Sequence, residues 1–210
     1  MSRGIDTRAR ILEAAELLMR ESGLARTTTK EIARAAGCSE PALYRHFASK
    51  EDLLVAVLQE RLPAFGSLIS QFTVDPGDRS LHDCLVDIAV ETTLFYEGSF
   101  AINVSLFSDP ALLRRHRAAL SALGTGPHLP LQDLAALLRA EQTRGRMNPD
   151  VDPDSTAAAL MGACFQRAFL HHFHGPTVPD ADNHRKQVRE FATGVVRALV
   201  TGIAPSSHID

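Results

Sequence analysis

Hydrophobic and polar positions recur with helical spacing along most of the 210-residue chain. The first such segment covers residues 6–22, where apolar positions follow the i, i+3, i+4, i+7 pattern of an amphipathic helix. These positions are Ile11, Ala14, Ala15, Leu18 and Met19. Gly23 follows, at a place where helices commonly end in a left-handed residue. The pattern therefore predicts a first helix that buries one face.

Two short helices are predicted next, separated by a turn that contains one glycine. Thr28 and Glu31 have the spacing of a capping box, which predicts the start of a second helix, and Gly37 ends it. Ser39 can cap a third helix, which tolerates Pro41 because N–H groups in the first turn have no partner within the helix. Helices this short are unstable alone, so we expect both to pack on the first one.

The rest of the chain also has a helical pattern. Ser49 and Asp52 predict the start of a fourth helix that runs to about Leu62, where Pro63 ends or kinks it. No strand-like alternation of useful length is found. We expect an all-α protein of about nine helices, in which helix four joins a small domain (residues 1–50) to a larger one (51–210). The later helices are predicted over about 81–95, 103–107 with a continuation over 111–121, 131–144, 154–174 and 180–201, with a loop over 124–130.

Charge divides the chain at the same place. The whole chain has a formal net charge of −3, yet residues 1–50 contain nine Lys or Arg against six acidic residues. The remaining residues contain 13 against 19. A basic N-terminal part on an acidic body is expected when only one end of a protein meets a polyanion.

Composition disfavours several other classes of protein. No apolar run reaches the roughly 20 residues of a membrane span, and no signal-peptide pattern opens the chain, so we expect a cytoplasmic protein. The cysteines, Cys38, Cys84 and Cys164, lie far apart among apolar residues, which is typical of reduced thiols in packed helices. No two of them have metal-ligand spacing. We expect no cofactor and no enzymatic activity.

The second and third helices, with their turn, have the pattern of a helix-turn-helix. On the third helix, Leu43 and Phe47 are four residues apart and share a face, which we expect to be core. Ser39, Arg45 and His46 fall largely on the other faces. This leaves a polar surface of the kind that enters a DNA major groove.

The segment TTTKEIARAAGCSEPALYRHFASKEDLL, from Thr27 to Leu54, resembles the N-terminal signature of the TetR family of transcriptional regulators. The resemblance covers about residues 6–62. It rests on the Thr run before the second helix, the Ala-Gly pair before the turn, Leu-Tyr-x-His-Phe on the third helix and Lys-Glu at the fourth. It implies a homodimer that binds a near-palindromic DNA operator, most often as a repressor, and is released by a small molecule. Residues 65–210 carry no signature of their own.

Physical roles can be assigned to the polar positions of this motif. Hydroxyls and free N–H groups at a helix N-terminus bind phosphate, and side chains early on a recognition helix reach base edges. Glu40 is a departure, because a carboxylate near phosphates is repulsive unless it accepts from a cytosine amine or faces solvent. The predicted phosphate contacts are Thr28, Thr29, Tyr44, His46 and Lys50, and the predicted base contacts are Ser39, Glu40, Pro41, Ala42 and Arg45.

The resemblance also implies roles for the larger domain. Its last two helices would pair with their copies in a second subunit, and a ligand would bind inside it. For Arg167, an ion pair with an acid of the same domain is the ordinary alternative. The predicted dimer contacts are Phe169, Val188, Phe191, Val195 and Leu199, and the predicted ligand contacts are Phe95, Phe100, Asn103, Phe107, Met161, Phe165 and Arg167.

Two alternatives remain open at the level of sequence. His171 and His174 are three residues apart on one helix, which is the spacing of a metal-binding pair in a metal sensor or a metal-dependent enzyme. Such an enzyme would leave the basic N-terminal part unexplained, and no metal is expected. The other alternative is a DNA-binding regulator or activator without ligand control. The sequence does not distinguish this from a ligand-controlled repressor.

Overall fold

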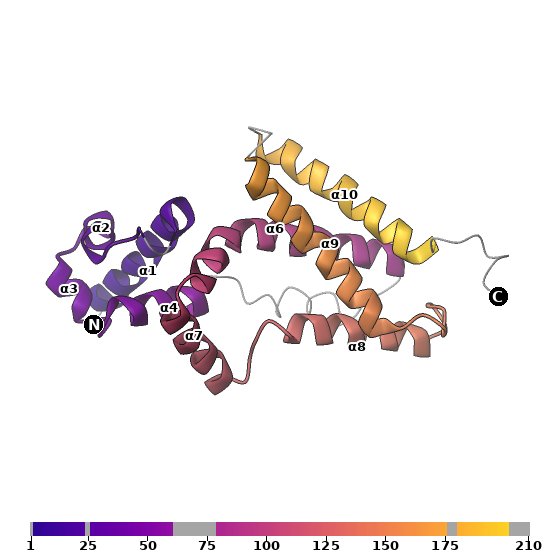
Figure 1. Cartoon of the computed structure of the whole chain (residues 1–210), viewed down its shortest axis with the longest axis horizontal. Coiled ribbons are helices and arrows are strands. Elements are labelled where there is room, and N and C mark those ends of the chain that lie inside the picture. Colours follow the sequence, from indigo (N-terminus) through magenta and orange to yellow (C-terminus); the bar gives the residue numbers. More distant parts are fainter. Residues whose placement is uncertain (1, 24–25, 61–78, 176–179, 202–210) are drawn as a thin grey trace. The chain divides into compact units, whose positions relative to one another are not determined.

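The computed structural model describes residues 2–23, 26–60, 79–175 and 180–201 (Figure 1). Within these ranges the chain forms nine α-helices and no strand, which confirms the predicted all-α class. None of the described helices is long and apolar enough to cross a membrane. The helices are α1 (Ser2–Ser22), α2 (Thr29–Ala35), α3 (Glu40–Tyr44), α4 (Lys50–Glu60), α6 (Leu81–Phe107), α7 (Pro110–Ala122), α8 (Leu129–Thr143), α9 (Pro153–His174) and α10 (Ala181–Thr201).

The chain divides into two compact units. Unit one comprises Met1–Ala64 with Gly98–Gly126, and unit two comprises Phe65–Glu97 with Pro127–Asp210. The long helix α6 contributes its N-terminal part to unit two and its C-terminal part to unit one. The domain boundary predicted after residue 50 stays a prediction, because compactness does not show which part folds independently.

Unit one packs the N-terminal helices around one apolar core. Met19 of α1, Ile32 of α2 and Leu43 of α3 are completely buried in it, together with Leu53 of α4 and Ile102 of α6. Ile11, Ala14, Ala15 and Met19, on the predicted inner face of the first helix, are all buried, which confirms that periodicity. The part of the fourth helix predicted around Leu62 and Pro63 lies outside the described residues.

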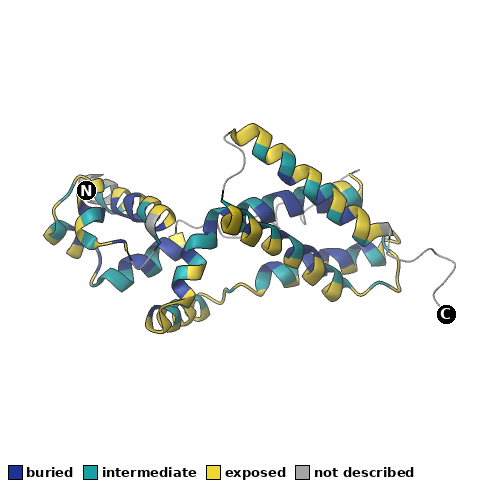
Figure 2. Ribbon diagram, turned by 45° about the horizontal axis from the view of Figure 1, so that its top comes forward, coloured by how far each residue is buried: buried dark blue, intermediate teal, exposed yellow. Residues whose placement is uncertain are grey.

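Unit two has a second core that α6, α8, α9 and α10 share. Ile88, Leu134, Leu160 and Val188 come from these four helices and are almost completely buried. α9 packs against both α8 and α10, and Figure 2 shows that much of the surface of α10 is exposed. Cys164 is also buried here, as predicted for an inert thiol, and burial raises its pKa to about 11.

One predicted interruption is wrong. The sequence predicts separate helices over 81–95 and 103–107, whereas α6 is continuous from Leu81 to Phe107. Gly98 does not break α6: an added Cβ at this position would lie 3.1 Å from the Arg20 side chain. The glycine therefore allows a close approach to α1 without ending the helix, which a one-dimensional pattern does not reveal.

A predicted continuation is wrong as well. The sequence predicts that residues 111–121 continue the preceding helix, but α7 is a separate helix that begins at Pro110. Asp109 has an extended backbone, and its carboxylate accepts hydrogen bonds from the N–H groups of Ala111 and Leu112 at 3.0 Å. This side-chain cap starts a new helix just where the chain changes direction.

Candidate DNA interface and the helical body

The N-terminus of α2 is built by a reciprocal capping box. Thr28 accepts a hydrogen bond from the Glu31 N–H at 3.2 Å, and the Glu31 carboxylate accepts from the Thr28 hydroxyl and N–H at 2.7 and 3.2 Å. These donors lower the pKa of Glu31. The box confirms the predicted helix start. It also means that the Thr28 hydroxyl already has a carboxylate partner, so a phosphate contact there competes with the cap.

Glu40 has a partner that the sequence does not reveal. Its carboxylate accepts a 2.5 Å hydrogen bond from the Thr29 hydroxyl, which ties the first turn of α3 to the first turn of α2. The Tyr44 hydroxyl lies 3.5 Å from the same Thr29 oxygen. Glu40 therefore helps to fix the angle between the two helices of the motif. The predicted base contact of Glu40 is not tested by this arrangement.

α3 is held in place by its apolar side and offers its polar side to solvent. Leu43 is completely buried and Phe47 nearly so, as predicted. Ser39 caps the helix by accepting a hydrogen bond from the Ala42 N–H at 3.3 Å. Tyr44 is 45% exposed and Arg45 is exposed. Tyr44 and Arg45, two of the side chains predicted to meet DNA, thus lie on an accessible face that the buried Leu43 supports.

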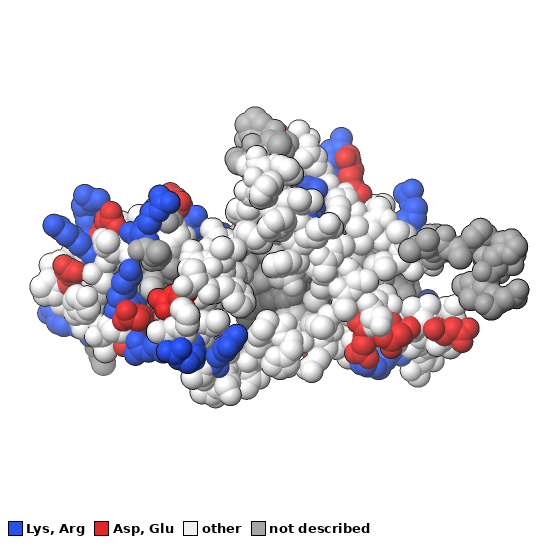
Figure 3. All heavy atoms as spheres, in the orientation of Figure 1, with Lys and Arg blue, Asp and Glu red and all other residues white. Residues whose placement is uncertain are grey.

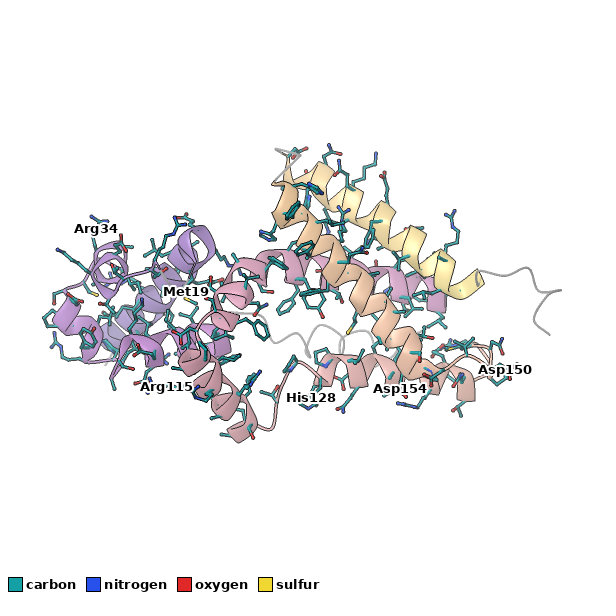
Figure 4. All side chains as sticks on the ribbon, in the orientation of Figure 1. Met19, Arg34, Arg115, His128, Asp150 and Asp154 are labelled. Carbon is teal, nitrogen blue, oxygen red and sulfur yellow. The ribbon has the colours of Figure 1, made fainter. Side chains whose placement is uncertain are left out.

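Positively charged side chains lie on the same unit as the exposed face of α3. Figure 3 shows Lys and Arg side chains over the helices of unit one, with fewer acidic side chains among them. Lys30, Arg34 and Arg45 are exposed, and Arg34 points outward from α2 (Figure 4). These three cations form no ion pair with any described residue. They are therefore available to a polyanion.

Comparison with known proteins identifies the family. The family model described as "Bacterial regulatory proteins, tetR family" matches residues 11–57, which span α1 to α4 and include the whole helix-turn-helix. This N-terminal part is that of a TetR-family transcriptional regulator. DNA binding in transcription regulation is therefore its function at the level of the family.

Curated relatives agree with this assignment. An uncharacterized helix-turn-helix-type transcriptional regulator of Bacillus subtilis, YvkB, is 39% identical over 83 residues, which are 39% of this chain and 44% of YvkB. The chain thus aligns with less than half of the length of that relative. UidR of Escherichia coli K12, also a helix-turn-helix-type regulator, is 28% identical over 74% of this chain and 76% of its own length.

Solved structures extend the likeness in fold to the helical body. A putative TetR-family regulator from Mesorhizobium loti has a TM-score of 0.71 at 18% identity and covers 96% of this chain and 98% of its own. FadR of Bacillus subtilis, solved with stearoyl-CoA, has a TM-score of 0.64 at 16% identity and covers 93% of this chain and 99% of its own. The all-helical fold, with an N-terminal helix-turn-helix and further helices after it, is therefore like that of solved TetR-family regulators.

The predicted ligand contacts are distributed over both units. Phe100, Asn103 and Phe107 lie in unit one, and the other four lie in unit two. Phe107 and Phe165 are not interior residues, because they are 68% and 49% exposed. Asn103 donates a hydrogen bond to the Ser99 hydroxyl at 3.2 Å. Contact of these positions with a ligand stays a prediction.

The predicted dimer contacts differ in how far they are buried within the protomer. Val188 is completely buried in the core of its own protomer, and its contact with a partner stays a prediction. Val195 and Leu199 are partly buried against the same core, and Phe191 lies under the Arg167 guanidinium at 5.1 Å. The stripe that the sequence assigns to a partner is mainly the inner face of α10. Phe169, in contrast, is 45% exposed.

An exposed apolar stripe lies on α9 instead. Phe165, Phe169 and Phe173 are four residues apart, so they lie along one side of the helix, and they are 49%, 45% and 72% exposed. Phe169 and Phe173 stack with ring centroids 5.8 Å apart. One turn before them, Gly162 is exposed with open space around it. Aromatic rings next to small residues on one face are typical of a protein–protein contact.

Arg167 forms an ion pair with an acidic residue of the same unit, which was the predicted alternative to a ligand contact. Its Nε lies 3.7 Å from Oε1 of Glu97, whose side chain is 7% exposed. His184 Nε2 lies 2.7 Å from the other carboxylate oxygen. Neither Glu97 nor His184 is among the predicted site residues. They are 87 positions apart and lie on helices without a motif, so the sequence contains no signal that joins them.

An open cavity of about 280 Å³ adjoins this group in unit two. Arg167 is the only predicted ligand contact among its lining residues. His171 and His184 line it from α9 and α10, and His174 lies at the same opening. Burial lowers the pKa of His171. Most of the lining residues are polar or charged, and the size of the cavity suits a small ligand or an ion with water.

Proposed function

We propose that the protein is a homodimeric repressor that binds a near-palindromic operator through α3 and is released by a small-molecule effector. The proposal is carried by the α3 surface, where Tyr44 and Arg45 are exposed while Leu43 is anchored in the core. A helix held in this way can enter a major groove without rearrangement. On this basis, we also propose a cytoplasmic location and no enzymatic role.

The phosphate and base contacts follow from this position of α3. Thr29, Tyr44, His46 and Lys50 would contact phosphates, and Arg45 would read a base edge from the exposed end of the helix. Pro41 and Ala42 are the apolar positions suited to a thymine methyl group. Glu40 would act mainly through Thr29, as a link that keeps α3 in position.

Dimerisation through α9 and α10 is supported by the stripe of Phe165, Phe169 and Phe173. A two-fold interface there brings two copies of α3 together, and successive major grooves require them about 34–36 Å apart. An effector would then act by changing this separation. FadR, a neighbour in fold, has been solved with stearoyl-CoA, which supports a small-molecule site in the body of this fold.

Within unit one, α7 is linked to α4, and this link would carry the effector signal. Arg115 of α7 lies 3.2 Å from the Asp52 carboxylate and 3.8 Å from that of Glu51, both in the first turn of α4. A shift of α7 would therefore move the start of α4, next to Lys50. Effector control requires different effector affinities for two states. Independent binding of DNA and effector in a titration would exclude it.

The experiment that tests this function is the selection of bound genomic DNA fragments at stated salt, followed by base-by-base affinity measurements for two variants. We expect Lys50→Ala to weaken binding to all sequences alike, because a phosphate contact carries no sequence information. We expect Arg45→Ala to cost about 1–3 kcal/mol and to relax the preference at one base pair of each half-site. Equal, sequence-independent losses in both variants would contradict the assignment of Arg45.

A further inference from the structure

Three potential metal ligands from three helices meet in unit two. Glu97 lies on α6, His171 on α9 and His184 on α10, and one donor atom of each lies within 4.8 Å of the others. The helices that carry them share the buried core of unit two, so the group has a firm support. His174, which the sequence pairs with His171, is exposed and is not part of the group.

The carboxylate in this group has an oxygen without a hydrogen bond. Oε2 of Glu97 lies 2.7 Å from His184 Nε2, whereas buried Oε1 has no hydrogen-bond partner among the described residues. Arg167 is 3.7 Å from Oε1, beyond hydrogen-bond distance, and its guanidinium lies over the Phe191 ring. A buried carboxylate oxygen left in this way is costly unless something binds it.

The group also has room beside it for further ligands. The cavity of about 280 Å³ opens onto His171 and His184, and one water occupies roughly 30 Å³ in the liquid. Several waters, or an oxygen-bearing molecule, therefore fit at coordination positions that the protein does not fill.

We propose that Glu97, His171 and His184 bind a divalent transition-metal ion, with Zn²⁺ as the representative ion. Two imidazoles and one carboxylate suit Zn²⁺, and three protein ligands with an open fourth position are typical of accessible zinc sites. Ligands of tetrahedral Zn²⁺ lie about 3.4 Å apart, so the histidine rings close in by rotating slightly. The cavity supplies the fourth ligand.

Arg167 has a defined place in this site. Its Nε lies 3.7 Å from Oε1 of Glu97, the carboxylate oxygen that is open to the ion. Its positive charge opposes the metal, so we expect lower affinity than at a site without a nearby cation. Metal binding here stands independently of whether DNA affinity responds to the metal.

The test is a titration of untagged, metal-stripped full-length protein with Zn²⁺ in competition with a chromophoric chelator. We expect one Zn²⁺ per protomer. We expect His184→Ala and Glu97→Gln each to weaken binding at least roughly tenfold, in line with the loss of one ligand. His174→Ala is the matched control, because it removes a histidine from the same cavity and should leave affinity unchanged. Circular dichroism of each variant checks that the helices remain folded.

Bound Co²⁺ provides a second measurement that does not depend on affinity. Its visible absorption reports ligand number and type, and we expect the spectrum of wild-type protein in the His174→Ala variant but not in His184→Ala. The proposal is overturned if wild-type protein takes up no more Zn²⁺ than a folded double variant, His171→Ala with His184→Ala. It is also overturned if His174→Ala loses as much affinity as His184→Ala.

Discussion

At the scale of single residues, three buried or half-buried carboxylates have three different roles. Glu40 accepts from a hydroxyl across the helix-turn-helix, Glu97 faces histidine and arginine, and Glu141 is enclosed by two arginines. The residue type is the same in each case, and the partner decides the role. These partners determine how the protein responds to pH and to substitution.

Glu141 predicts a pH dependence of stability. It is 1% exposed and accepts hydrogen bonds from Arg146 at 2.6 and 2.7 Å and from Arg144 at 2.8 Å, which lower its pKa. A carboxylate whose pKa is lower in the folded than in the unfolded state stabilises the fold at pH values above its unfolded-state pKa. This stabilisation is lost as the pH falls through the folded-state pKa. We therefore expect Glu141→Gln to lower the free energy of unfolding by about 2 kcal/mol near neutral pH.

The measurement is urea unfolding of both proteins from neutral to acidic pH. The difference between wild type and Glu141→Gln should shrink on acidification, because the wild type then loses the same charge. Glu13→Gln, at an exposed position of α1, is the control and should show neither effect. A difference that is constant with pH would mean that the charge of Glu141 does not contribute.

At the scale of elements, the end of α1 shows how far local sequence determines structure. Gly23 is predicted to end the helix, and it does so with φ of +76°. The sequence does not indicate that α6 approaches this residue so closely that an added Cβ would lie 2.9 Å from the Ser105 hydroxyl. Backbone conformation follows from neighbouring residues, whereas contacts between distant helices follow from the packing of the whole unit.

Two alanine substitutions separate these contributions. Gly124 also has positive φ, at +62°, but it has open space around it. We expect Gly124→Ala to cost about 1–2 kcal/mol from backbone strain alone, and Gly23→Ala to cost more because of the added contact. Thermal unfolding of both variants measures the difference. Adding Ser105→Ala to Gly23→Ala should recover the excess, and failure to recover it would mean that the hydroxyl is not the obstacle.

At the scale of the whole molecule, the sequence predicts features that depend on short spacing. Two such features are confirmed, and each is defined by residues no more than four positions apart. They are the capping box of Thr28 and Glu31 and the buried pair of Leu43 and Phe47. Features that depend on packing are missed or misplaced. Val188 has the pattern of an interface residue, yet it is buried in its own protomer because α10 turns that stripe toward α6, α8 and α9.

The exposed stripe of α9 predicts the oligomeric state. We expect Phe169→Glu to raise the dimer dissociation constant by about two orders of magnitude, since each dimer carries two substituted copies and each truncated aromatic anchor costs about 1–2 kcal/mol. Light scattering after size-exclusion chromatography measures this. Phe107→Glu is the control, because Phe107 is a 68% exposed phenylalanine on α6, a helix that does not carry the stripe. An unchanged dimer in Phe169→Glu would place the interface elsewhere.

The hydrogen bond between Thr29 and Glu40 has a consequence for engineering. Retargeting a regulator to a new operator usually begins by randomising the residues at the start of the recognition helix. In this chain, Glu40 should be left fixed in such a library, because replacing it removes the hydrogen bond that links the first turns of α3 and α2 and so alters the position of α3 for every base at once. The positions to vary are Pro41, Ala42 and Arg45, because a substitution at each of them changes a local contact and leaves the position of α3 relative to α2 unchanged.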